Sequence, residues 1–139
     1  MSKNKYINMD ITNLPTPAFI VDERLLKRNL ETLKSVIDRT GCKILLAQKG
    51  FSMFYFYSLI GKYLNGTTAS SLFEARLGYE EMELKSKDRK LETHIFNPSY
   101  RDDEFDEIME ITNHIVFNSF NQWKKFKDKV KEFQEKVLD

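Results

Sequence analysis

The chain has 139 residues, of which 41% are hydrophobic and 31% are charged, a composition that fits one ordinary globular domain. Its 22 basic and 21 acidic residues leave a formal net charge of +1, which gives no argument for a nucleic-acid or membrane-surface partner, and no apolar run is long enough to span a membrane. The single cysteine excludes an internal disulfide framework and favours a reducing cytoplasm. With one cysteine and two histidines we expect no metal site. The first ten residues lack the apolar core of a secretory signal.

The first predicted elements are a strand followed by a helix. Residues 18–21 are apolar and follow a proline-containing, extended segment, which favours a strand. Leucine and isoleucine then recur at helical spacing over residues 26–37. Asp22 is the predicted N-cap of this helix, and Gly41 lies where a left-handed C-terminal residue is expected.

The rest of the chain repeats a unit of strand, cap and helix. Residues 43–47 are typical of a strand buried on both faces, and a second helix is predicted over residues 51–64. Three later candidate strands each precede a hydroxyl placed three residues before an acid or amide: 66–70 before Ser71 and Glu74, 93–97 before Ser99 and Asp102, and 114–118 before Ser119 and Gln122. An apolar stripe over 123–137 predicts a final amphipathic helix. Such units imply parallel strands, in either a doubly wound sheet or a (β/α)8 barrel.

Lys49 is the first candidate for chemistry. It follows the most apolar predicted strand and precedes Gly50 and Phe51. In parallel α/β folds the catalytic groups gather at the carboxyl ends of the strands. A lysine that is partly desolvated at this position has a nucleophilic amine, which can condense with an aldehyde cofactor. The alternative is a solvated lysine in an ordinary loop.

Five stretches carry a family resemblance. They are Leu14–Phe19, Gly41–Ser52, Asn65–Ala75, Asn97–Phe105 and His114–Ser119, and together they extend over nearly the whole chain. In order and spacing they resemble the carboxynorspermidine (carboxyspermidine) decarboxylases, which belong to the alanine-racemase-like, fold type III enzymes that use pyridoxal 5'-phosphate (PLP). One departure is Gln48, because the family usually has Ala-Leu-Lys or a similar sequence at the cofactor lysine.

The resemblance implies a fold and an activity. The expected fold is α/β, a partial (β/α)8 barrel of the alanine-racemase/ornithine-decarboxylase type, in which residues 1–139 form about the first half and the second half and a β domain are absent. The expected cofactor is PLP, and the expected reaction is decarboxylation of carboxynorspermidine or carboxyspermidine to norspermidine or spermidine. The expected partners are this small polyamine precursor and, for the complete enzyme, a second subunit of a homodimer. Since a complete barrel needs roughly 250 residues, the chain alone is expected to bind PLP poorly and to be inactive.

The same resemblance assigns site residues. Lys49 is the expected PLP-binding and catalytic lysine, Thr68, Ser71 and Glu74 are expected near the cofactor, and Tyr100 is expected at the active-site rim, in contact with substrate. Turn chemistry explains Thr68 and Ser71 equally well, and a capping role explains Glu74. Both histidines begin predicted strands, so we expect them at the end of the sheet away from the chemistry.

Two other functions remain open at this point. The chain can belong to another fold type III decarboxylase, acting on diaminopimelate, ornithine or arginine, and an assay with several substrates separates these possibilities. It can also be a non-catalytic, truncated half-barrel. The short length favours this second alternative, and the intact surroundings of Lys49 oppose it.

Overall fold

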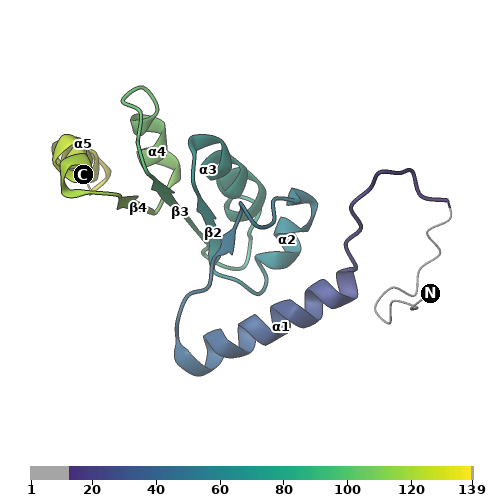
Figure 1. The fold of residues 1–139 in the computed structure, drawn as a ribbon. Helices are drawn as coiled ribbons and strands as arrows, with labels where there is room; N and C mark the ends of the chain where they lie inside the picture. The colour runs from purple at the N-terminus through teal and green to yellow at the C-terminus, as the bar shows by residue number, and fades with distance from the viewer. Residues whose placement is uncertain (1–12, 139) are drawn as a thin grey trace.

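A computed structural model describes residues 13–138, so the expectation for the first ten residues lies outside the described part. The elements are, in order, α1 (Glu23–Thr40), β1 (Leu46–Ala47), a 3-10 turn η1 (Phe54–Phe56), α2 (Tyr57–Ile60), β2 (Gly66–Ala69), α3 (Leu72–Gly78), a π-helical turn η2 (Tyr79–Glu83), β3 (Glu92–Asn97), α4 (Phe105–Ile111), β4 (His114–Phe117) and α5 (Phe120–Leu138). In Figure 1, α3, α4 and α5 follow one another above the row of strands, and α1 lies below it. Among the described residues, no helix has both the length and the apolar character that crossing a bilayer requires.

The strands form one parallel sheet in the order β1-β2-β3-β4, and each neighbouring pair is parallel. This confirms the predicted α/β class. The order follows the chain without a reversal in the described part. Consecutive β/α units of a barrel have this order, whereas a doubly wound sheet reverses its strand order at a switch point.

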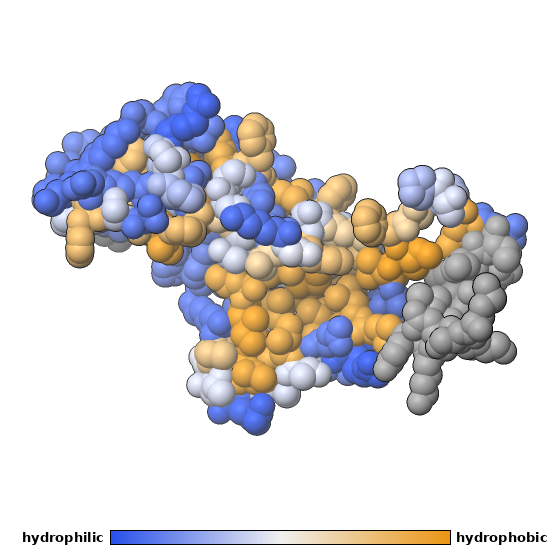
Figure 2. Space-filling model, viewed as in Figure 1, coloured by the Kyte–Doolittle hydropathy of each residue, from blue (hydrophilic) through white to orange (hydrophobic). Residues whose placement is uncertain are grey.

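In the part of the chain that the structure describes, helices cover one face of the sheet and leave the other uncovered. Side chains on that face enter two hydrophobic clusters: Ala69, Ile95, Ile115 and Phe117 pack with α3, α4 and α5, and Leu46 packs with α1, α2 and η2. On the opposite face Phe96 and Val116 remain 41% and 49% exposed. Figure 2 shows a broad hydrophobic area in the middle of the face that it views. We call the uncovered side of the sheet, which carries Ala47, Thr68, His94, Phe96 and Val116, the open face.

The predicted helix caps are present at three helices. Asp22 accepts hydrogen bonds from the backbone of the first turn of α1, and Gly41 ends that helix with a φ of 70°. Ser71 Oγ accepts from the Glu74 N–H at the start of α3, and Ser119 Oγ accepts from the Gln122 N–H in α5. The predicted strands before these last two caps are β2 and β4, so local sequence signals located both junctions.

Three predicted elements differ from the structure. Residues 18–21 are not a strand, and Phe19 is 99% exposed. A strand needs a hydrogen-bonded neighbour, and no strand pairs with the outer edge of β1 in the described part of the chain. The strand expected over 43–47 shortens to two residues, and one side of it is exposed because no segment within residues 13–138 covers the open face. The helix expected over 51–64 is reduced to η1 and α2, in a segment where aromatic side chains lower helix propensity.

The middle capping pattern is also wrong. Helix α4 begins at Phe105, and its N-cap residue, Glu104, makes no side-chain cap bond. Asp102 forms an ion pair with Lys125 of α5, 2.8 Å away, instead of capping α4. A hydroxyl and an acid three residues apart therefore do not specify a helix start without the packing around them.

Candidate active site

Lys49 lies in the turn that follows β1. The turn is closed by the Ala47 carbonyl, which accepts hydrogen bonds from Gly50 N at 2.9 Å and Phe51 N at 3.2 Å. The predicted position of Lys49, just after the carboxyl end of a strand, is therefore confirmed. The Lys49 side chain is exposed, however, so the expected partial desolvation is absent. The reason is that the open face has no cover in the described residues.

Side chains from three neighbouring strands form a hollow beside Lys49. Its volume is about 120 Å³, and its lining includes Lys49, Thr68, Ser70, Glu74 and Phe96. Lys49 follows β1, Thr68 and Ser70 lie at the end of β2, and Phe96 lies near the end of β3. Glu74 lies in the first turn of α3. The structure therefore brings Lys49, Thr68 and Glu74 together, as the sequence predicts, at the carboxyl edge of the sheet.

The residue before Lys49 is anchored on the opposite side of the sheet. Gln48 is 2% exposed, and its Nε2 donates to the Glu74 carbonyl at 2.8 Å. The Tyr57 hydroxyl donates to Gln48 Oε1 at 3.2 Å. Burial, with a smaller contribution from the charge of Glu74, raises the pKa of Tyr57 to about 12. Gln48 thus fixes the turn after β1 and leaves Lys49 directed away from the helices. In the sequence, the only sign of this role is a polar residue beside an apolar strand.

Glu74 has two structural functions. Its backbone N–H is capped by Ser71 Oγ at 3.3 Å, and its carboxylate Oε2 accepts from the Ser70 N–H and the Ser70 hydroxyl, each at 2.7 Å. The capping interpretation is therefore confirmed for Ser71, although the carboxylate reaches back to Ser70 rather than to the N-cap residue. No hydrogen bond or ion pair joins Lys49 to Glu74 within residues 13–138. Thr68 contributes to the lining through its side of β2.

Tyr100 is not at this hollow. It is 4% exposed and packs against Phe105, Phe117 and Phe126 inside the cluster beneath α4 and α5. Its hydroxyl donates to the Val116 carbonyl at 2.9 Å and accepts from the Asn97 N–H at 3.2 Å. The side chain is buried and its polar atom is bonded to backbone, so Tyr100 has a packing role in the described residues, and its expected contact with substrate stays a prediction.

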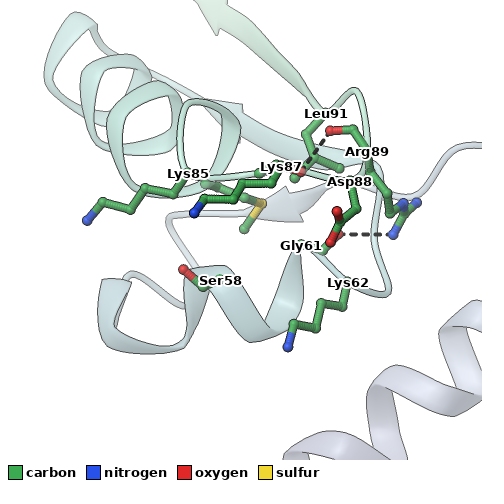
Figure 3. A pocket seen from close by; sticks show the side chains of 10 residues that line it. Ser58, Gly61, Lys62, Lys85, Lys87, Asp88, Arg89 and Leu91 are labelled. Carbon is green, nitrogen blue, oxygen red and sulfur yellow. Dashed lines mark hydrogen bonds between the residues drawn. The ribbon is translucent and has the colours of Figure 1, made fainter.

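A larger hollow, of about 190 Å³, lies away from Lys49, between the end of α2 and the loop before β3 (Figure 3). Arg89 Nη1 donates to the Gly61 carbonyl at 3.0 Å, and Ser86 Oγ donates to the Arg89 carbonyl at 2.7 Å. These bonds hold the loop over the buried Met82 and Leu91. The lysines around the rim, Lys62, Lys85 and Lys87, are exposed, and we assign no chemistry to this hollow.

The structure also groups three residues that the sequence did not. Glu92, His94 and His114 lie within reach of one another on the open face of β3 and β4. His114 begins its strand as expected, but His94 is the third residue of β3. The expectation of no metal site rested on residue counts, which carry no information on strand register.

Lys49 lies at the carboxyl end of a parallel strand, beside small polar side chains of the next strand. This arrangement defines an α/β protein that carries its reactive groups at one edge of the sheet.

No family model matches the chain. It is, however, 40% identical over 116 residues to the carboxynorspermidine/carboxyspermidine decarboxylase of Campylobacter jejuni. It is 35% identical over 124 residues to the carboxyaminopropylagmatine decarboxylase of Synechocystis, and 35% identical over 113 residues to the carboxynorspermidine/carboxyspermidine decarboxylase of Herminiimonas arsenicoxydans.

These alignments cover 84%, 89% and 81% of this chain but 28%, 30% and 29% of the relatives, so the chain spans less than a third of their length. A crystal structure of carboxynorspermidine decarboxylase from Campylobacter jejuni, complexed with norspermidine, superposes with a TM-score of 0.77 over 85% of this chain and 30% of that one. The chain is therefore a homologue of the N-terminal portion of the carboxynorspermidine/carboxyspermidine decarboxylases. This confirms the resemblance drawn from the five sequence stretches.

Proposed function

We propose that this chain is the N-terminal part of a PLP-dependent decarboxylase that removes the carboxylate of carboxynorspermidine or carboxyspermidine. The observation that carries the proposal is the position of Lys49 at the carboxyl edge of the sheet, in a chain 40% identical to a decarboxylase of this type. The complete protein is proposed to be a (β/α)8 barrel with a further β domain, acting as a cytoplasmic homodimer.

The residues around the hollow suit PLP. Lys49 offers an exposed primary amine for the cofactor aldehyde, and Thr68 and Ser70 offer hydroxyl groups beside it. Phe96 gives the hollow an apolar wall on β3. When bound, PLP supplies the electron sink for the pair that remains as carbon dioxide leaves.

The chain's own residues position that amine. The bonds of Gln48 to Glu74 and Tyr57 fix the turn that carries Lys49. The Glu74 carboxylate fixes Ser70 and so ties the end of β2 to α3. Ser71 acts as the N-cap of α3 and holds Glu74 in place. We therefore propose that Lys49 is the catalytic lysine, that Thr68 lies beside the cofactor, and that Ser71 and Glu74 position its surroundings.

A chimera tests this function. The chain replaces the matching portion of the Campylobacter jejuni decarboxylase, to which it is 40% identical. After incubation with PLP, borohydride reduction and peptide mass spectrometry are expected to place a pyridoxyl group on Lys49. Lys49→Ala is expected to remove the label and the activity, and the matched control Lys62→Ala, at an exposed lysine outside the Lys49 hollow, is expected to keep both. A label on another residue, or none in the correctly folded chimera, rejects the assignment.

Substrate choice is tested on the same chimera. Carbon dioxide release is measured with carboxynorspermidine and carboxyspermidine, and with ornithine, diaminopimelate and arginine for the alternative decarboxylases. Carboxyaminopropylagmatine is a second candidate, because one relative that is 35% identical carries that name. A labelled Lys49 without turnover of any of these compounds favours the non-catalytic alternative.

We also propose that the 139 residues alone bind PLP poorly and do not decarboxylate. The open face of the sheet exposes Phe96 and Val116, and Lys49 lies on the same uncovered side. A reactive site needs water to be excluded, and the described residues supply one wall of such a site. An absorbance titration of the isolated chain with PLP measures this. A stoichiometric absorbance change that Lys49→Ala abolishes is the contrary result.

A further inference from the structure

Glu92, His94 and His114 meet on the open face at a point that the proposed function does not use. Glu92 and His94 are two residues apart in β3, so their side chains leave the sheet on the same side. His94 is the register partner of His114 in β4, and the two imidazole rings have centroids 4.2 Å apart. The sheet register alone therefore brings together two imidazoles and one carboxylate.

Three specific atoms converge in this group. Glu92 Oε2 lies 2.9 Å from His94 Nε2 and 3.8 Å from His114 Nε2, and the ligand atoms of all three residues lie within 4.8 Å of one another. Zinc bonds imidazole nitrogen and carboxylate oxygen at about 2.0–2.2 Å, so tetrahedral ligands lie about 3.3 Å apart. Zinc binding therefore requires Glu92 Oε2 and His94 Nε2 to separate from 2.9 Å, and the exposed His114 ring to approach from 3.8 Å, to about this spacing.

The carboxylate is already oriented. Lys43 donates to Oε1 of Glu92, which leaves Oε2 facing the two histidines. A charge-assisted partner on the distal oxygen is what commonly fixes a ligating carboxylate.

We propose that Glu92 Oε2, His94 Nε2 and His114 Nε2 form a zinc-binding site. Two imidazole nitrogens and one carboxylate oxygen are a ligand set that zinc accepts, with a fourth position open to water. The ion joins β3 to β4, the last strand of the described sheet. The site contains none of the residues of the Lys49 hollow, so the zinc proposal does not depend on the proposed decarboxylase function.

Zinc binding is measured by isothermal titration of the untagged chain, with Cys42→Ser in every sample, because the exposed thiol is a competing zinc ligand. We expect one zinc ion per chain with a dissociation constant below about 100 µM. Magnesium and calcium, which prefer all-oxygen sites, are expected not to compete. Nitrogen-15 spectra of the histidine side chains are expected to show both Nε2 signals shifting with the same zinc dependence.

His114→Ala is the informative variant, because His114 is 56% exposed and its removal leaves the core intact. We expect it to weaken zinc binding at least about tenfold. The matched control Glu110→Gln, an exposed acid in α4, is expected to leave it unchanged. Repeating the titration in the chimera covers the case of an unstable isolated chain. Binding weaker than the stated limit in both proteins, or binding that His114→Ala leaves intact, overturns the proposal.

Discussion

Glu74 accepts two hydrogen bonds from one residue, because its Oε2 lies 2.7 Å from both the backbone nitrogen and the hydroxyl oxygen of Ser70. Ser70 directly follows β2, and Glu74 lies in the first turn of α3. One carboxylate therefore joins a strand end to a helix start, at the rim of the hollow that contains Lys49.

Replacing Glu74 by glutamine is expected to lower the free energy of unfolding by about 1–2 kcal/mol, because hydrogen bonds to an ionised acceptor are stronger than those to a neutral one. Urea unfolding, followed by circular dichroism, measures the change. Glu110→Gln serves as the control, since Glu110 is an exposed acid on α4. Equal effects of the two substitutions contradict the assigned role.

Tyr100→Phe is expected to destabilise the chain by about 1–3 kcal/mol, because it leaves the bonded backbone groups around Ile95 and Val116 without their partner. The matched control is Tyr55→Phe at a side chain that is 78% exposed, for which a change within about 0.5 kcal/mol is expected. In the chimera, the loss at Tyr100 is expected to appear in stability and not as a selective rise in KM. A selective rise in KM at unchanged stability restores the substrate-contact hypothesis.

Stability is expected to fall above pH 10, because burial raises the pKa of both Tyr57 and Tyr100 to about 12. A raised folded-state pKa means that the folded chain keeps protons that the unfolded chain loses between about pH 10 and 12. The stabilisation is thus complete below pH 10 and is lost as pH rises through 12. Between pH 9 and pH 11 the expected loss is about 1 kcal/mol for each tyrosine.

Absorbance at 295 nm tests this pH dependence, since two tyrosines are expected to ionise late. Tyr57→Phe removes one late ionisation and reduces the alkaline loss of stability. A titration without any late ionisation step is the contrary observation.

Local signals predicted the elements that local interactions decide. The caps at Ser71 and Ser119 and the strands before them were readable because each depends on residues three or four apart. The segment at 18–21 has an equally apolar sequence but is not a strand, because a strand exists only with a neighbour. Propensity alone cannot supply that neighbour.

The site divides in the same way. Lys49, Thr68 and Glu74 meet because strand ends of a parallel sheet share one edge, which the order of elements predicts. The burial of Tyr100 depends on packing against α5, and the approach of His94 to His114 depends on register between strands. Both are tertiary relationships over a separation of some twenty residues, and no local pattern encodes them.

Gly78 is expected to tolerate no side chain, because a Cβ there would lie 2.1 Å from Thr67 Oγ1 and 3.0 Å from Gln48 Nε2. Gly78→Ala is expected to cost about 1–3 kcal/mol through overpacking, despite the better helix propensity of alanine. The control Gly50→Ala meets only an ordinary contact of 3.4 Å with the Ala47 carbonyl, so little change is expected.

A double-mutant cycle locates the cause of this cost. Thr67 Oγ1 is buried and has no hydrogen-bond partner, so Thr67→Ala removes the clashing atom without breaking a bond. The two substitutions together are expected to destabilise less than the sum of each alone. Additive effects place the strain elsewhere. Because Gly78 also leaves room for Gln48, we expect Gly78→Ala in the chimera to reduce pyridoxyl labelling of Lys49, and Thr67→Ala to restore part of it.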